Sequence, residues 1–184
     1  MIIWLLIAIV LFVLIPIMYI NKIIVLSNRI DNAWSQIDVQ LKKRADLVPN
    51  LVNTVKGYMK HERKIIEVVT KSREEMLKAG NNMKAIAKAE SQLSSALKTI
   101  FALAENYPKL KSNENFKLLQ EQLESIENKI AYARQFYNDS VLEYNNMVTT
   151  IPGVWFVGLT GKAKTREYFE AKDIERKPVK VDFE

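Results

Sequence analysis

The first twenty residues contain no charged side chain, and this feature constrains the chain more than any other. As a helix, an apolar stretch of about 20 residues crosses a hydrocarbon core of about 30 Å. A secretory signal would carry basic residues before such a stretch and a small-residue cleavage site after it, whereas here the first basic side chain is Lys22. We therefore expect residues 1–20 to form an uncleaved transmembrane signal-anchor.

Aromatic and basic side chains mark the ends of this span. Trp4 lies near its start and Tyr19 near its end, where amphipathic rings favour the level of the lipid headgroups. Lys22, Arg29 and the run Lys42-Lys43-Arg44 all follow the span. Because basic residues accumulate on the cytoplasmic side, we expect the N-terminus outside and the C-terminal body in the cytoplasm.

The composition excludes several kinds of site. The chain has no cysteine, so disulfides, thiolate metal ligands, cysteine nucleophiles and lipid attachment at a lipobox are ruled out. A zinc site needs at least three protein ligands, and the chain has a single histidine, His61. Its five glycines form no phosphate-binding motif. We predict no cofactor, no metal site and no enzymatic activity.

The positive charge lies mostly in the first part of the body. Residues 21–80 carry 12 basic and 7 acidic side chains, and so supply most of the net charge of +6. We interpret Lys42-Lys43-Arg44 as a solvated helix face. Nucleic-acid binding would require clustered basic residues interleaved with aromatic ones, and apart from that triplet neither is present, so we predict no nucleic-acid partner. Acidic residues are expected on outer helix faces, paired with lysines: Glu74 and Glu75 with Lys71 and Lys78, and Glu124 and Glu127 with Lys129.

Apolar residues recur with a period close to 3.6 in three segments, which predicts three long amphipathic helices. The first continues from the membrane span over residues 21–78, with a kink near Pro49. The second covers residues 83–106. The third covers residues 113–150, capped by Ser112 or Asn113, and a short helix follows over about 154–170. Residues 173–184 are predicted to be a disordered tail.

These helices must bury their apolar stripes against one another because their connections are short. We therefore predict an all-α fold, in which residues 21–172 form an antiparallel bundle of three long helices plus a short C-terminal helix. Tyr132 and Phe136 widen the apolar face of the third long helix and are expected to meet a second neighbour.

A short hydrophobic segment, residues 154–159, contains Trp155 and Phe156. It has two interpretations, which are a cap on the open end of the bundle and an insertion at a membrane surface. A chain that crosses the bundle three times ends far from its own membrane. Contact with that membrane would then require the first helix to fold at Pro49 or Gly57.

Six asparagines in or beside the apolar stripes are candidates for a polar network: Asn32, Asn50, Asn53, Asn128, Asn138 and Asn145. Asparagine is a poor helix former, and a buried amide needs hydrogen-bond partners. We expect these side chains to bond either between helices of one chain or between subunits.

Several blocks of sequence resemble the LemA family. They are NRIDNAWSQIDVQLKKRADLVPNLVNTVKGYMKHE over residues 28–62, AENYPKLKSNENFKLLQEQL over 104–123, ENKIAYARQFYNDSVLEYN over 127–145 and REYFEA over 166–171. The resemblance implies a single-pass protein of the bacterial inner membrane with a helical domain. Residues 154–159 are more apolar than the matching segment of the family. The family is associated by gene neighbourhood with membrane metalloproteases and TPM-domain proteins, and relatives organise magnetosome membranes.

These features together predict a protein that acts through its position in the membrane. The leading hypothesis is a non-enzymatic scaffold, anchored in the lipid bilayer, that self-assembles into a homo-oligomer and organises or shapes the membrane, because anchors held parallel in one plane associate more readily. The alternative is an adaptor or regulator that binds a membrane protease or an envelope-stress partner. A membrane-associated enzyme, which would depend on His61, comes last.

Overall fold

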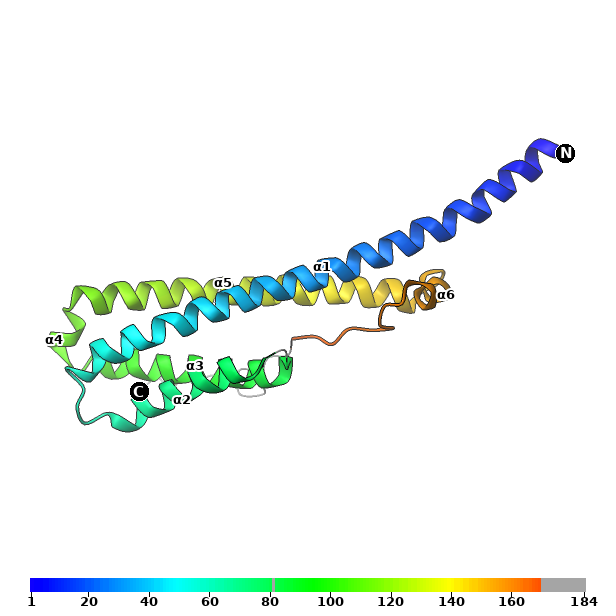
Figure 1. Ribbon diagram of the computed structural model, residues 1–184. Helices are drawn as coiled ribbons and strands as arrows, with labels where there is room; N and C mark the ends of the chain where they lie inside the picture. The colour runs from blue at the N-terminus through cyan, green and yellow to red at the C-terminus, as the bar shows by residue number, and fades with distance from the viewer. Residues whose placement is uncertain (81, 170–184) are drawn as a thin grey trace, which may run out of the picture. The chain divides into compact units, whose positions relative to one another are not determined.

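The computed structural model describes residues 1–80 and 82–169, and within these ranges it contains helices and turns but no strand. The order along the chain is α1 (Ile2–Lys56), α2 (Arg63–Lys78), α3 (Met83–Ala104), α4 (Pro108–Lys111), α5 (Glu114–Thr149), α6 (Gly153–Phe156) and the 3₁₀ helix η1 (Val157–Thr160) (Figure 1). The predicted all-α class is confirmed.

The first long helix ends earlier than the apolar pattern indicates. α1 runs without a break from the apolar span through Pro49 and ends at Lys56, and α2 begins only at Arg63. Backbone N–H groups of Tyr58 and Met59 donate to the carbonyl of Val55, which closes the helix. The expected helix over residues 21–78 is therefore two helices, and the chain makes four long passes instead of three.

The chain divides into two compact units. Unit 1 consists of Met1–Ile37 and Tyr132–Tyr168, so it holds the N-terminal part of α1, the C-terminal part of α5, α6 and η1. The two long segments lie side by side and run in opposite directions (Figure 1). Residues at helical spacing fill the space between them: Ile23, Leu26, Ile30, Ala33 and Ile37 on α1, and Ala133, Tyr137, Val141, Tyr144 and Val148 on α5.

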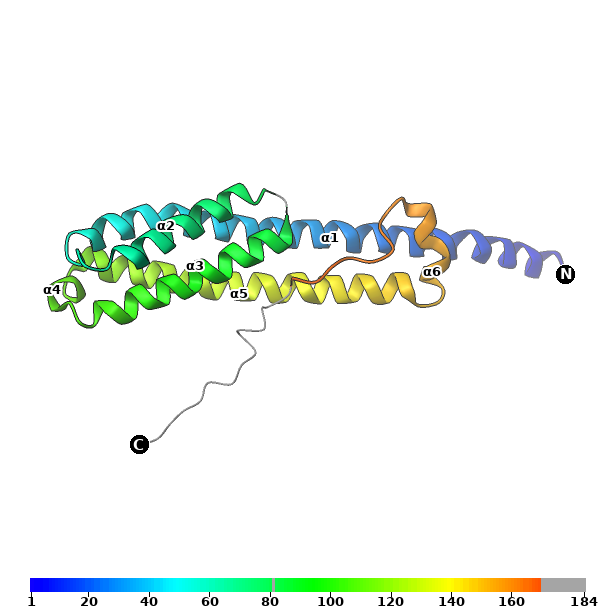
Figure 2. The same cartoon turned by 90° about the horizontal axis from the view of Figure 1, so that it is seen from below.

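Unit 2 holds Asp38–Ala131, together with Phe169 among the described residues. Its helices are the last part of α1, α2, α3, α4 and the first part of α5 (Figure 2). The core contains one apolar stripe from each long helix, represented by Val48 and Val55, Ile66 and Val69, Leu93 and Leu97, and Phe116 and Leu123. Each such side chain contributes roughly 1.5–3 kcal/mol when fully buried.

Asparagines begin two of these helices. The side-chain oxygen of Asn82 accepts from the N–H of Ala85 at the start of α3, and that of Asn113 accepts from the N–H of Phe116 at the start of α5. Both bonds satisfy N–H groups that have no partner within the first helical turn. Of the two predicted caps for α5, Asn113 is the one used.

After α5 the chain turns sharply and returns along unit 1. We call residues 151–160, which include α6 and η1, the hairpin, and residues 161–167 the strap. Helical structure ends at Thr160, because Gly161 adopts φ +63°, a left-handed conformation that favours glycine. Of the short helix expected over 154–170, the described residues, which end at 169, are helical only as far as 160. The predicted disordered tail, residues 173–184, lies outside the described residues.

Candidate functional site

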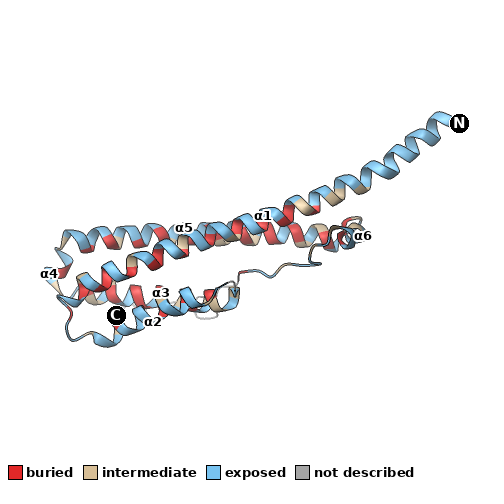
Figure 3. Cartoon of the chain, in the orientation of Figure 1, coloured by how far each residue is buried: buried red, intermediate tan, exposed pale blue. Residues whose placement is uncertain are grey.

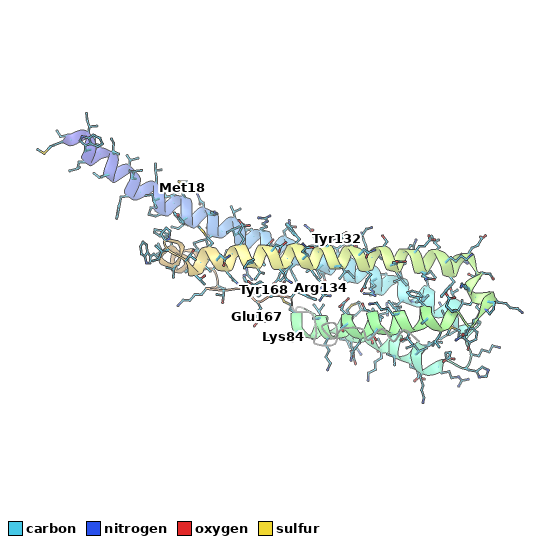
Figure 4. All side chains as sticks on the ribbon, turned by 180° about the vertical axis from the view of Figure 1, so that it is seen from behind. Met18, Lys84, Tyr132, Arg134, Glu167 and Tyr168 are labelled. Atoms are coloured by element: carbon cyan, nitrogen blue, oxygen red, sulfur yellow. The ribbon has the colours of Figure 1, made fainter. Side chains whose placement is uncertain are left out.

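The apolar part of α1, at the start of unit 1, is exposed along most of its length. Its most apolar 18-residue window has a mean hydropathy of 3.0 and contains no buried residue, so by length and composition it can cross a membrane. In Figure 3 most of this segment, up to the N-terminus, has the pale blue colour of exposed residues. Trp4 near the start is exposed, and so is Met18 near the end of the segment (Figure 4).

The hairpin lies against the end of this apolar segment. The ring of Phe156 stacks on the ring of Tyr19, with centroids 5.9 Å apart. Figures 1 and 2 both place α6 beside α1. The first helix ends directly before Gly57, one of the two positions at which a fold was expected to allow contact with the span. With that break, α5 brings the chain back to Tyr19.

The hairpin has two faces with different surroundings. Phe156 is half-buried and Val157 is buried, so this side packs on unit 1. Ile151, Trp155 and Leu159 are 72%, 65% and 73% exposed. The sequence treats residues 154–159 as one hydrophobic patch, whereas the structure separates packing residues from outward ones.

Gly153 allows the hairpin to approach α5 closely. A Cβ atom at this position would lie 1.9 Å from the backbone oxygen of Met147, nearer than any side chain can come. Gly158, on the same hairpin, has no atom within 4 Å of the corresponding position. The first glycine is therefore required by packing and the second is not.

Side chains of α5 hold the strap in place. Tyr144 donates its hydroxyl to the carbonyl of Ala163, and Tyr137 donates to that of Glu167. The amide of Asn145 binds both backbone groups of Arg166, accepting from its N–H at 2.8 Å and donating to its carbonyl at 3.0 Å. The Asn145 side chain thus forms the pair of hydrogen bonds that the backbone of a neighbouring strand would otherwise form with Arg166.

Arg166 ties the strap to α1 as well. Its guanidinium donates to the hydroxyl of Ser27 and to the carboxylate of Asp31, each at 3.1 Å. Burial raises the pKa of the Tyr137 and Tyr144 hydroxyls; the positive charge of Arg166 opposes this shift, while Asp31 adds to it. Burial therefore favours the neutral, hydrogen-bonding form of both phenols.

A mixed aromatic and charged surface covers the other side of the α1 and α5 pair. We call Val25, Arg29, Tyr132, Phe136 and Glu143 the outer face. Arg29 forms an ion pair with Glu143 at 2.8 Å and lies 5.3 Å from the centre of the Phe136 ring. Tyr132 and Phe136 were expected to meet a second neighbour, yet both are exposed.

A buried polar cluster lies in unit 2. Arg44 forms ion pairs with Glu90 at 3.3 Å and with Glu127 at 2.5 Å, and donates to the hydroxyl of Ser94. Lys42 and Lys43 are exposed as predicted, but Arg44 is buried, so its assignment to a solvated face is wrong. Its position three residues after Leu41, within the apolar stripe, is the signal that could have shown this. Glu127 was expected on an outer face beside Lys129, and this is also wrong, because Glu127 is half-buried and forms its ion pair with Arg44.

A sequence model described as the LemA family matches residues 33–183, which is most of the chain. The chain belongs to the LemA family. The matched range includes the buried Arg44 cluster, the hairpin and the strap, so these features of the LemA-family chain fall within the part that defines its family.

Curated relatives of this LemA-family chain include magnetosome proteins. Magnetosome protein MamQ 2 of Paramagnetospirillum magneticum is 24% identical over 94% of this chain and 72% of its own length. Magnetosome protein MamQ of Magnetospirillum gryphiswaldense is 25% identical over 79% of this chain and 62% of its own length. With the apolar segment of α1, this similarity indicates a membrane-associated protein.

The predicted asparagines do not form one group. Asn145 binds the strap, which is an interaction within the chain, and Asn138 is half-buried. Asn32, Asn50, Asn53 and Asn128 are exposed. These four remain candidates for contacts between copies of the LemA-family chain.

The remaining titratable residues lie mostly on the surface of the described part of the chain. His61 is exposed in the turn between α1 and α2, and residues 1–80 and 82–169 contain no group of three His, Asp or Glu side chains that could hold a metal ion. Glu74 pairs with Lys78 and Glu75 with Lys71, as predicted. The hairpin end and the outer face of unit 1 are therefore the best candidates for functional surfaces.

Proposed function

We propose that this LemA-family chain is a non-enzymatic helical scaffold that crosses the bacterial inner membrane once, associates side by side with its own copies and organises the bilayer around them. The observation that carries the proposal is the continuity of α1. One helix includes the bare apolar span and, without a break, residues buried in the core of unit 1, so no linker separates unit 1 from the anchor.

The outer face is the surface proposed for self-association. It exposes the Tyr132 ring and part of the Phe136 ring beside the Arg29–Glu143 ion pair. Exposed aromatic and arginine side chains are the residue types that dominate binding at protein interfaces. Asn32, one turn after Arg29 on α1, adds an exposed amide next to this face. Anchoring supports association, because copies in one membrane already share an orientation.

Disulfide cross-linking in membranes tests this proposal, since the natural chain has no cysteine. We expect Tyr132→Cys to form dimers of the full-length chain under mild oxidation. Leu118→Cys is the matched control, because Leu118 is also an exposed apolar residue of α5 but belongs to unit 2. Equal cross-linking at the two positions, or none at either, would contradict association through the outer face.

The proposed orientation rests on Lys22 and Arg29, which follow the span directly. A membrane-impermeant maleimide applied to intact cells should label a cysteine at Ile2 only if the N-terminus is outside. A cysteine at Leu118 should react only after the membrane is opened. The reverse labelling pattern would show that the N-terminus is cytoplasmic and the helical body outside.

A groove in unit 2 favours a second function, that of an adaptor for a membrane protease or an envelope-stress partner. The groove has a volume of about 700 Å³ between the end of α1 and α2, with Met59 and Ile66 in its apolar floor. Its rim carries four basic residues, Lys56, Lys60, Arg63 and Lys71, against Glu67 and Glu74. An acidic amphipathic helix from a metalloprotease or a TPM-domain protein would match this lining.

The adaptor function would be supported if one such partner co-purified with the chain at equal stoichiometry. The double variant Lys60→Glu with Arg63→Glu should then lose the partner.

A further inference from the structure

We propose that the hairpin is a second membrane contact, which places Trp155 and Leu159 in the headgroup region of the bilayer that the N-terminal span crosses. This inference deepens the proposed function and depends on the span. A single helix leaves a protein free to turn about its own axis, whereas two contacts fix which side of unit 1 faces the membrane.

The first argument is depth. Tyr19 belongs to the last turn of the charge-free stretch, and Lys22 is the first charged side chain. Because the Phe156 ring lies 5.9 Å from the Tyr19 ring, the hairpin sits within about one helical turn of the level where the apolar stretch ends. That level is the membrane interface if the span crosses the bilayer.

The second argument is the direction of the side chains. Val157 is buried and Phe156 is half-buried against unit 1. The outward positions are all apolar: Ile151, Val154, Trp155 and Leu159. A tryptophan beside aliphatic residues is the composition that favours the headgroup boundary, where the indole ring has both an apolar and a hydrated environment.

The third argument is charge. Lys162 and Lys164 follow the hairpin directly, and Lys22 follows the span at the same end of unit 1. Lys22 and Lys164 are exposed and Lys162 is half-buried. Basic residues beside an inserted apolar segment attract anionic headgroups on the cytoplasmic leaflet. The occupant that fits this surface is therefore an anionic lipid bilayer.

The fourth argument is rigidity. Gly153 fits the hairpin closely against Met147, and Asn145 clamps the strap that follows. Exposed apolar residues on a flexible loop would lose conformational entropy on insertion. Held in this position, the hairpin has already lost most of that freedom.

The test uses the full-length chain in vesicles of phosphatidylcholine and phosphatidylglycerol. Single cysteines at Leu159, Leu142 and Phe12 are labelled with an environment-sensitive fluorophore and quenched by spin-labelled lipid or by aqueous iodide. Leu142 is the matched control, because it is an exposed leucine of unit 1 that lies nine residues before the hairpin on α5. We expect lipid quenching at Leu159 to exceed that at Leu142 about threefold, as for a side chain at the interface.

The outcomes separate this inference from the proposed function. Quenching by lipid at Phe12 but not at Leu159 overturns the hairpin contact and leaves the span intact. Absence of lipid quenching at Phe12 overturns both. A label at Leu159 that is shielded from lipid and from iodide indicates a second copy of the chain instead of the bilayer, and also overturns the inference. Trp155→Cys repeats the measurement at a second outward position, in case Leu159→Cys fails to fold.

Discussion

Arg44 forms an ion pair with Glu90 in the interior of unit 2, where the two side chains are only 4% and 3% exposed. Ser94 links them further, since its hydroxyl accepts from Arg44 and donates to Glu90. Glu127 approaches the same guanidinium from α5, so α1, α3 and α5 meet at one charge cluster. Removing one partner of such a pair leaves an uncompensated buried charge.

Arg44→Ala should therefore destabilise the protein strongly. We expect a loss of about 3–5 kcal/mol in the free energy of unfolding, because the Glu90 carboxylate stays buried without its partner. The measurement is denaturant unfolding of the full chain followed by circular dichroism. Lys43→Ala is the control, and as an exposed neighbour it should change stability by less than about 0.5 kcal/mol.

Replacing both buried charges should cost less than removing one. Arg44→Met combined with Glu90→Met leaves no unpaired charge between these two positions, and apolar replacements of buried ion pairs are often close to neutral. A double variant that is less stable than Arg44→Ala would show that the cluster contributes more than the pairing of its charges.

Gly153→Ala should loosen the hairpin. The added methyl group would meet the backbone oxygen of Met147, so either α5 or the hairpin must move, at a cost of about 1–3 kcal/mol. We expect trypsin to cleave this variant after Lys162 and Lys164 faster than it cleaves the natural chain. Gly158→Ala adds the same methyl group where nothing lies within 4 Å, so its cleavage rate should match that of the natural chain.

Asn145→Ala should release the strap. The substitution leaves the N–H and the carbonyl of Arg166 without their amide partner, a loss of about 1–3 kcal/mol for buried groups. Hydrogen exchange of the strap amides, above all that of Arg166, should become faster. Asn146→Ala removes the adjacent amide, which is exposed, and should leave this exchange unchanged.

The sequence predicts the helices of this chain better than their connections. The apolar period locates α3 and α5 to within two residues at each end, because every buried position on them continues one stripe. Met59 continues the stripe of α1 in the same way, yet it lies in a turn and is buried there. Periodicity reports which side chains reach the core, and a buried turn residue satisfies it as well as a helical one.

The candidate surfaces depend on tertiary structure and were therefore only partly predictable. Composition identifies residues 154–159 as hydrophobic, but the pairing of Phe156 with Tyr19 follows from the number of long passes, which the break after Lys56 changes from three to four. Arg44 was assigned to the surface because of its charged neighbours. Its partner Glu90 is distant in the sequence, and no local pattern connects the two.

The phenols that hold the strap make its stability dependent on pH. Burial raises the pKa of Tyr144 and of Tyr137, with Arg166 opposing and Asp31 adding to the shift. Below about pH 10 both hydroxyls are protonated in the folded and the unfolded chain, so their contribution is complete. Above it the unfolded chain loses these protons first, and the contribution declines as the pH rises through the folded-state pKa values.

Tyr137→Phe combined with Tyr144→Phe tests this dependence. Near pH 8 the double variant should be less stable than the natural chain by about 1 kcal/mol for each lost hydrogen bond. That difference should shrink as the pH rises above about 10, because only the natural chain loses stability through these two phenols. Tyr132→Phe, at an exposed position of the same helix, is the control and should change stability near pH 8 by less than about 0.5 kcal/mol. A difference that stays constant up to pH values of about 11 would mean that burial does not hold these phenols neutral.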